Sequence, residues 1–255
     1  NPGPPELFRQ RRSQIIRGIA PEYNIVSYNG RARGHKVDLM RGLYQRGITK
    51  NNLISCYSVM GPESSEVTQE LSLPWRTSDI RDAQEPMHRN APGSELTSEE
   101  AWHTHYHYYY SPESQRELLN SAVCLTTETW GHDVPLAQGR FHHVSEKTYR
   151  PMVSVMPFVS WSQNHTLARL HAQGYETFDH IWSEHYDTLA DTDQKTSEVL
   201  DICEHIASLS LSDIATVLHD TLPECEHNYW NYHNRWHSGQ HARHLHEILN
   251  AWQPS

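Results

Sequence analysis

Hydrophobic positions along this chain fall into short apolar runs separated by segments in which apolar residues recur at helical intervals. Four runs are rich in β-branched and aromatic residues and predict buried strands: YNIVSY (23–28), LISCYSV (53–59), AVCLTT (122–127) and PFVSW (157–161). The first run is bounded by Pro21 and by the Asn29-Gly30 pair, which is typical of a strand that ends in a turn.

Helical spacing predicts the segments between these strands. Apolar residues repeat every three to four positions over HKVDLMRGLYQR (35–46), and Gly47 follows as a stop signal. Further helices are predicted after three capping residues, namely Ser111 (followed by Pro112), Ser145 and Asn164, the last with Gly174 as its stop.

A strand, a helix and a second strand form a βαβ unit, which requires parallel pairing and a right-handed crossover. We therefore predict an α/β fold: an open parallel sheet with helices on both faces and a helical C-terminal extension. The expected divisions are a lead-in at 1–20 with a short basic helix, an α/β domain at 21–196 with a long surface excursion at 61–100, and the extension at 197–255, broken near Pro223 and Gly239.

Composition narrows the classes of protein to which the chain can belong. A formal charge of −10 over 255 residues argues against binding nucleic acid through a broad basic surface. The four cysteines show no paired metal-ligand spacing, which favours reduced thiols and a cytoplasmic location. No apolar run approaches the roughly 20 residues of a membrane span.

Polar clusters follow three of the predicted strands: NGRARGHK (29–36), ETW (128–130) and SQNHT (162–166). Ligands of open parallel sheets bind at the carboxyl ends of the strands. The first cluster places Arg31, Arg33, His35 and Lys36 at a helix start, where cations need a compensating anion such as a diphosphate. The alternative is a solvated basic loop that pairs with some of the 31 acidic residues.

A second candidate anion site is SEKTYRP (145–151). Ser145 can cap a helix and Glu146 suits its first turn. Lys147 does not suit this position, because a cation in the first turn interacts unfavourably with the helix dipole. Tyr149 and Arg150 would add a stacking surface and a second cation. Taken alone, the pattern is more typical of a solvated helix face.

Together these segments resemble a known group of proteins. The motifs that carry the likeness are NGRARGHKVDLMRGLYQRG (29–47), LNSAVCLTTETW (119–130), VSEKTYRPMVSVMPFVSW (144–161), HTLARLHAQGYETF (165–178) and WSEHYD (182–187). The chain resembles a family of glycosyltransferase-like proteins of phages, large viruses and bacteria that are distantly similar to α1,3-fucosyltransferases. The likeness covers about residues 23–190 and implies the Rossmann-type, donor-binding half of a GT-B fold.

The resemblance also implies roles for single residues. Arg33 and Lys36 match the basic position that binds the donor diphosphate, although family members usually carry arginine where this chain has Lys36. Glu146 matches a residue that contacts donor ribose or sugar hydroxyls, and Lys147 matches one that contacts phosphate. Glu128 matches a glutamate at the end of the preceding strand, so Glu128 and Glu146 are the candidate catalytic residues.

The expected function is therefore transfer of a sugar from a GDP- or UDP-sugar to a glycan, a protein or a modified DNA base, without a metal or other required cofactor. Charge on the departing diphosphate would be stabilised by Arg33, Lys36 and Lys147. In the related fucosyltransferases the general base lies in the acceptor-binding half, and only about 20 residues precede the first strand here, so a partner chain could supply it. The alternative function is a non-catalytic, glycosyltransferase-derived structural or binding protein, such as a virion or assembly component.

Three weaker signals compete with this interpretation. His103, His105 and His107 alternate as three metal ligands on one strand face would, and His237, His241 and His244 fall on one helix face. The DTD triplet (191–193) resembles the metal motif of another glycosyltransferase fold but is interpreted as a loop or helix cap. Asn164-His165-Thr166 is a glycosylation sequon.

Overall fold

A computed structural model describes residues 4–29, 34–50, 52–56, 112–129, 134–136, 139–141 and 144–237. The excursion expected at 61–100 and the histidine alternation at 103–107 lie outside these residues, as does Gly239. Within the described part of the chain, no helix is both long enough and apolar enough to cross a membrane.

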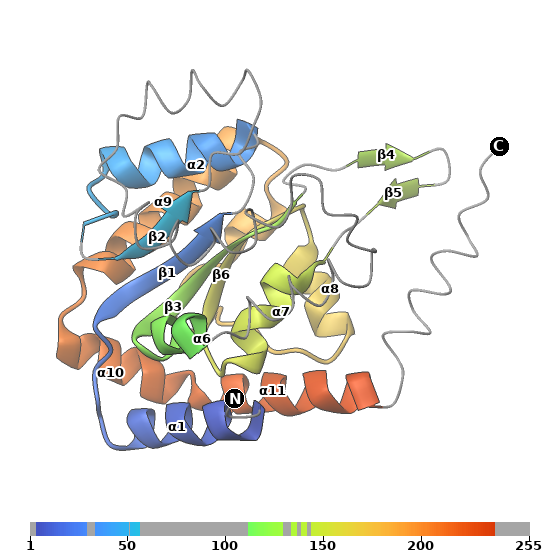
Figure 1. Ribbon diagram of the computed structural model, residues 1–255. Helices are drawn as coiled ribbons and strands as arrows, with labels where there is room; N and C mark the ends of the chain where they lie inside the picture. The colour runs from blue at the N-terminus through green and yellow to red at the C-terminus, as the bar shows by residue number, and fades with distance from the viewer. Residues whose placement is uncertain are drawn as a thin grey trace, which may run out of the picture.

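The sheet contains four parallel strands, β1 (Tyr23–Asn29), β2 (Leu53–Cys56), β3 (Ser121–Thr127) and β6 (Phe158–Trp161), in the order β2-β1-β3-β6 (Figure 1). Central strand β1 pairs Val26 with Leu53 of β2 on one side and with Cys124 of β3 on the other. A short antiparallel hairpin, β4 (Val134–Leu136) and β5 (Gly139–Phe141), precedes the last helix before β6 and was not predicted. The predicted open parallel sheet is confirmed.

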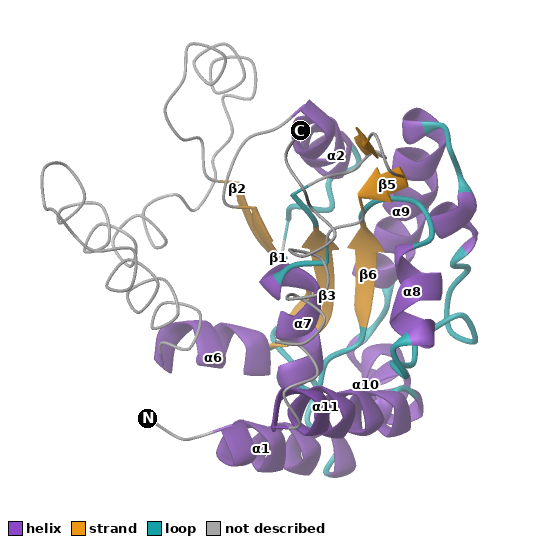
Figure 2. Ribbon diagram, turned by 90° about the vertical axis from the view of Figure 1, so that its right-hand side faces the viewer, coloured by secondary structure: helices purple, strands orange, loops and turns teal. Residues whose placement is uncertain are grey.

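The helices are α1 (Pro4–Ile16), α2 (Gly34–Gln45), α6 (Pro112–Leu119), α7 (Glu146–Val153), α8 (Thr166–Ala172), α9 (Thr192–Ser208), α10 (Leu211–Asp220) and α11 (Leu222–His237), with a 3₁₀ turn η1 (His185–Thr188). Figure 2 shows α6 and α7 on one face of the sheet and α9 on the other, where α2 packs against α9. Helices α1, α10 and α11 lie below the amino-terminal ends of the strands. Helices therefore cover both faces, as predicted.

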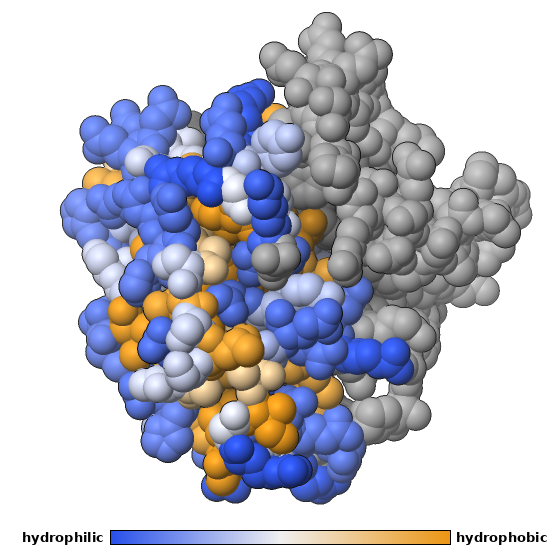
Figure 3. All heavy atoms as spheres, turned by 90° about the vertical axis from the view of Figure 1, so that its left-hand side faces the viewer, coloured by the Kyte–Doolittle hydropathy of each residue, from blue (hydrophilic) through white to orange (hydrophobic). Residues whose placement is uncertain are grey.

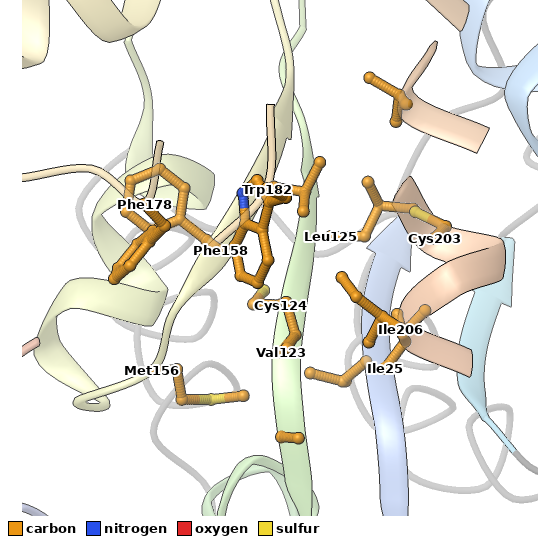
Figure 4. Packing of buried hydrophobic residues seen from close by; sticks show 14 of the residues in the cluster. Ile25, Val123, Cys124, Leu125, Met156, Phe158, Phe178, Trp182, Cys203 and Ile206 are labelled. Atoms are coloured by element: carbon orange, nitrogen blue, oxygen red, sulfur yellow. The ribbon is translucent and has the colours of Figure 1, made fainter. Parts of the chain in front are cut away.

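The hydrophobic core fills the space between the sheet and these helices. In Figure 4, Cys203 and Ile206 of α9 lie near Ile25 of β1 and Leu125 of β3. Phe158 and Phe178 belong to the same core and lie on the other side of β3 in this view. Burial raises the pKa of the Cys203 thiol to about 12, so this cysteine is an inert core residue.

Helix α1 is more tightly attached than a lead-in segment would be. It begins at Pro4, earlier than the extended start that the sequence predicts, and its Arg11 is buried. The Arg11 guanidinium donates to three main-chain carbonyls, those of Leu119 (3.1 Å), Ser121 (2.8 Å) and Ala122 (3.1 Å). These bonds tie α1 to the amino end of the central strand β3.

The cap predicted for α8 is wrong by one residue. His165, with a φ of 61°, is the N-cap and makes no side-chain capping bond. Asp187, from η1, instead accepts a hydrogen bond from the N–H of Leu167 at 3.1 Å. The side-chain oxygen of Asn164 accepts from Lys195, which removes it from the helix end. The predicted stop at Gly174 is confirmed by its φ of 78°.

The C-terminal helices break near Pro223, as predicted, and also at a place that was not predicted. Helix α9 starts at the cap Asp191, as the interpretation of the DTD triplet expected, and runs across the boundary placed at residue 196. The next interruptions fall at Leu209–Ser210 and at Thr221. Pro223 lies in the first turn of α11, where a helix needs no N–H from that residue, so the proline does not break it.

Apolar side chains are also exposed at the end of the molecule formed by α1 and α10. Ile16, Ile19 and Leu211 are 55%, 43% and 60% exposed, and α1 packs against α10. In Figure 3, which views the left side of Figure 1, hydrophobic residues lie in the middle and lower parts of the surface, among hydrophilic ones.

Candidate functional site

The chain reverses its direction across the sheet between β1 and β3. After β1 it enters α2, which packs with α9, whereas after β3 it reaches α7 on the opposite face. Such a reversal is a topological switch point, at which the ligands of open parallel sheets bind. The carboxyl ends of these two strands and the helix starts beside them form a region called here the β1–β3 edge (residues 29, 35–36, 127–129 and 145–148).

Glu128 lies at the centre of the β1–β3 edge and is completely buried. One carboxylate oxygen accepts from the N–H of Ser145 (2.9 Å) and the hydroxyl of Thr148 (2.6 Å). The other accepts from the hydroxyl of Ser145 (2.6 Å) and the N–H of Thr129 (3.3 Å). Glu128 therefore fixes the N-terminus of α7 to the end of β3.

The main chain of Glu128 makes two more connections. Its N–H donates to the carbonyl of Trp161 at 3.0 Å, and its carbonyl oxygen lies 3.2 Å from Nε2 of His35. The ring of His35 stacks on Trp161, with centroids 4.7 Å apart and planes 11° apart. One residue thus joins β3, β6, α2 and α7.

Lys36 is also at this edge, but its side chain is buried. Its ammonium donates a hydrogen bond to the carbonyl of Thr127 at 2.9 Å. The Thr127 hydroxyl in turn donates to the side-chain oxygen of Asn29 on β1. Lys36 is therefore engaged inside the protein, whereas Arg31 and Arg33, predicted beside it, lie outside the described residues.

The sequence prediction for the start of α7 is confirmed. Ser145 is the N-cap, and its hydroxyl oxygen accepts from the N–H of Lys147 at 3.3 Å. The Lys147 ammonium lies 3.3 Å from the same oxygen and forms an ion pair with Glu146. The side chains of Lys147 and Glu146 are 20% and 51% exposed, so both charges reach the surface.

Two predicted site residues point elsewhere. The guanidinium of Arg150 lies over the ring of Tyr28 on β1, 3.9 Å from its centroid, and is buried there. The hydroxyl of Tyr149 lies 3.3 Å from a side-chain oxygen of Gln173, and burial raises the pKa of Tyr149 to about 12. The structure therefore does not join these two residues to Glu146 and Lys147. The reason is that α7 descends from the edge, so its second turn packs against β1 and the neighbouring helices.

Sequence reasoning missed the role of Thr148 and the stacking of His35 on Trp161. Thr148 contacts Glu128 across 20 positions of sequence, a relationship that no local pattern encodes. Trp161 and Trp182 are buried, whereas Trp230 is 53% exposed.

No group of three metal-ligating side chains occurs among the residues that the structure describes. Comparisons with protein-family models, curated proteins and solved structures found no match.

Proposed function

We propose that the chain binds a nucleoside-diphosphate sugar at the β1–β3 edge and acts as the donor-binding part of a glycosyltransferase. The observation that carries this proposal is the position of Lys147. Its ammonium is held on the N-cap hydroxyl of α7, beside the topological switch point, and remains partly exposed. Glu146 already pairs with this ammonium, and a diphosphate would bring further negative charge to the same helix N-terminus, where unpaired N–H groups favour anions.

The same geometry supports different roles for Lys147 and Glu146. Lys147 and the N-terminus of α7 would stabilise the negative charge that develops on the diphosphate as the bond between the anomeric carbon and the phosphate oxygen breaks. Glu146 is the more exposed of the pair and offers acceptor oxygens to sugar or ribose hydroxyls. Because Glu128 and Lys36 are buried and engaged with protein groups, they support the edge rather than contact the donor.

Binding of nucleoside diphosphates tests this proposal directly. A ligand at 100 times its dissociation constant adds about 2.7 kcal/mol of stability, which thermal melting detects readily. We expect GDP or UDP to raise the melting temperature, and the matching nucleotide sugar to be hydrolysed or transferred. A melting temperature that no common nucleoside diphosphate moves at millimolar concentration contradicts donor binding. Binding without any turnover would instead favour a non-catalytic, glycosyltransferase-derived protein.

A further inference from the structure

The hydrogen bonds of the Ser145 hydroxyl reveal how Lys147 is held. A serine hydroxyl has one hydrogen to donate and two lone pairs to accept with. Here the hydrogen goes to Glu128, 2.6 Å away, and the oxygen faces two donors of Lys147, its N–H and its ammonium, each at 3.3 Å. The full hydrogen-bonding capacity of this hydroxyl is therefore used between one carboxylate and one lysine.

The carboxylate of Glu128 determines the direction of this arrangement. An ionised carboxylate only accepts hydrogen bonds, so it keeps the Ser145 hydrogen pointing inward and leaves the oxygen lone pairs for Lys147. Thr148 and the N–H of Ser145 hold the carboxylate itself in place from α7. A buried group thus controls the position of a surface ammonium through the Ser145 hydroxyl.

We propose that Glu128 and Ser145 are positioning residues for Lys147: they fix its ammonium at the N-terminus of α7 so that it meets a phosphate group in one defined place. This inference rests on the proposed donor site and specifies how that site is built. It changes the role expected for Glu128, because a carboxylate that is buried and bonded through both oxygens does not contact substrate.

A double-mutant cycle separates positioning from a purely structural role. Ser145→Gly removes the hydroxyl and keeps a residue that N-caps accept, and it also takes one donor from the buried Glu128 carboxylate. We expect Ser145→Gly to weaken GDP or UDP binding about tenfold when Lys147 is present, and to have no further effect in a Lys147→Ala background. Equal losses in both backgrounds would overturn the proposal. Ser145→Thr, which keeps the hydroxyl, should restore most of the affinity.

Ser210 provides a matched control. It is the N-cap of α10, and its hydroxyl also donates to a carboxylate, that of Asp213 at 2.7 Å, but α10 lies at the amino-terminal ends of the strands. Ser210→Gly should leave diphosphate affinity unchanged. A loss equal to that of Ser145→Gly would show a general effect of cap removal and contradict positioning.

A measurement without ligand distinguishes failure of this inference from failure of the proposed function. In protein labelled with ¹³C at lysine Cε, we expect NMR relaxation of Lys147 to show a more mobile side chain in Ser145→Gly and in Glu128→Gln than in the wild type. Unchanged mobility in both variants would refute positioning even if diphosphates bind. Increased mobility in a protein that binds no diphosphate would keep the positioning and refute the donor site.

Discussion

The ammonium of Lys36, in the first turn of α2, donates to the main-chain carbonyl of Thr127 at the end of β3, 2.9 Å away. This bond joins the start of α2, the helix that follows β1, to the end of β3. The resemblance matched Lys36 to a cation that binds a phosphate, whereas the structure shows a buried lysine that links α2 to β3. Its removal should affect folding more than removal of a cation on the surface.

We therefore predict that Lys36→Met lowers the free energy of unfolding by about 1–3 kcal/mol, because a buried carbonyl loses its partner. Urea denaturation followed by circular dichroism measures this change. Lys50→Ala, which alters an exposed lysine beyond the far end of α2, should stay within about 0.5 kcal/mol of the wild type. Equal stabilities for the two variants would show that the link to Thr127 contributes nothing.

For Lys147 we expect substitution to have a large effect on ligand binding and a small effect on folding stability. Under the proposed function, Lys147→Ala would remove a charge-assisted hydrogen bond to phosphate worth about 1.5–3 kcal/mol, so diphosphate affinity should fall roughly 10- to 150-fold. Stability should change by only about 0–1 kcal/mol, because the ion pair with Glu146 is partly exposed. Isothermal titration with GDP and UDP, with Lys50→Ala as the control, measures the binding effect.

Glu146→Gln should separate the two parts of the donor. The amide keeps one acceptor and the shape of the side chain, so affinity for the bare diphosphate should stay close to that of the wild type. Affinity for the intact nucleotide sugar should fall, because hydrogen bonds from sugar hydroxyls to a charged acceptor are stronger. If the wild type and the variant give equal titration curves with the bare diphosphate and with the nucleotide sugar, Glu146 belongs to an ordinary solvated helix face.

Much of the fold follows from the periodicity of the chain. Buried runs with β-branched residues predict the four parallel strands, and a serine followed by an acidic residue predicts the start of α7 at Ser145. These features are local, since strand alternation and helix capping depend on residues within one or two turns of each other.

The parts that the sequence did not predict depend on contacts between distant segments. Asn164 has the right chemistry for a cap, but Lys195 engages it and Asp187, 20 positions after Leu167, takes its place. Likewise, the sequence places Arg150 one turn after Glu146 and cannot show that Tyr28 covers it. The site was therefore predicted by its location at the strand ends, whereas the direction of each side chain was not.

Two neighbouring arginines allow a sharp test of how α1 is attached. Arg11 is buried and bonded to three carbonyls, and burial lowers its pKa to about 10, whereas Arg12 forms an exposed ion pair with Glu226. Arg11→Ala should cost more than about 2 kcal/mol of stability, because the carbonyls lose their donors. Arg12→Ala should cost about 0–1 kcal/mol. Comparable urea midpoints for both variants would mean that α1 is not anchored through Arg11.

The carboxyl of Glu184 should make stability depend on pH. Burial raises its pKa above the usual 4.5, although Thr177 and the N–H of Phe178 donate to it and oppose the rise. The folded state therefore holds this proton more tightly than the unfolded state does. The resulting stabilisation is fully present below pH 4.5 and is lost as the pH rises through the raised pKa.

Glu184→Gln mimics the protonated form and tests this sign. Urea denaturation of the wild type and the variant at pH 4 and pH 7 gives two differences in the free energy of unfolding. We expect the free energy of unfolding of the variant, relative to that of the wild type, to be higher at pH 7 than at pH 4. Any fixed cost of the amide is the same at both pH values and does not affect this comparison. The reverse order would mean that the pKa of Glu184 is lowered on folding.

The strand order also has a consequence for how the chain folds. Strands β1 and β3 lie side by side at the centre of the sheet, yet Ser27 and Leu125, which bond across them, are 98 positions apart, whereas Thr126 and Val159 of β3 and β6 are 33 apart. Closing the longer loop costs more chain entropy, and distant pairings slow folding. We therefore expect β3, α7 and β6 to assemble first and β1 to dock late. In stopped-flow refolding, Val159→Ala should then slow folding, whereas Ile25→Val should mainly speed unfolding; the reverse pattern would place β1 in the folding nucleus.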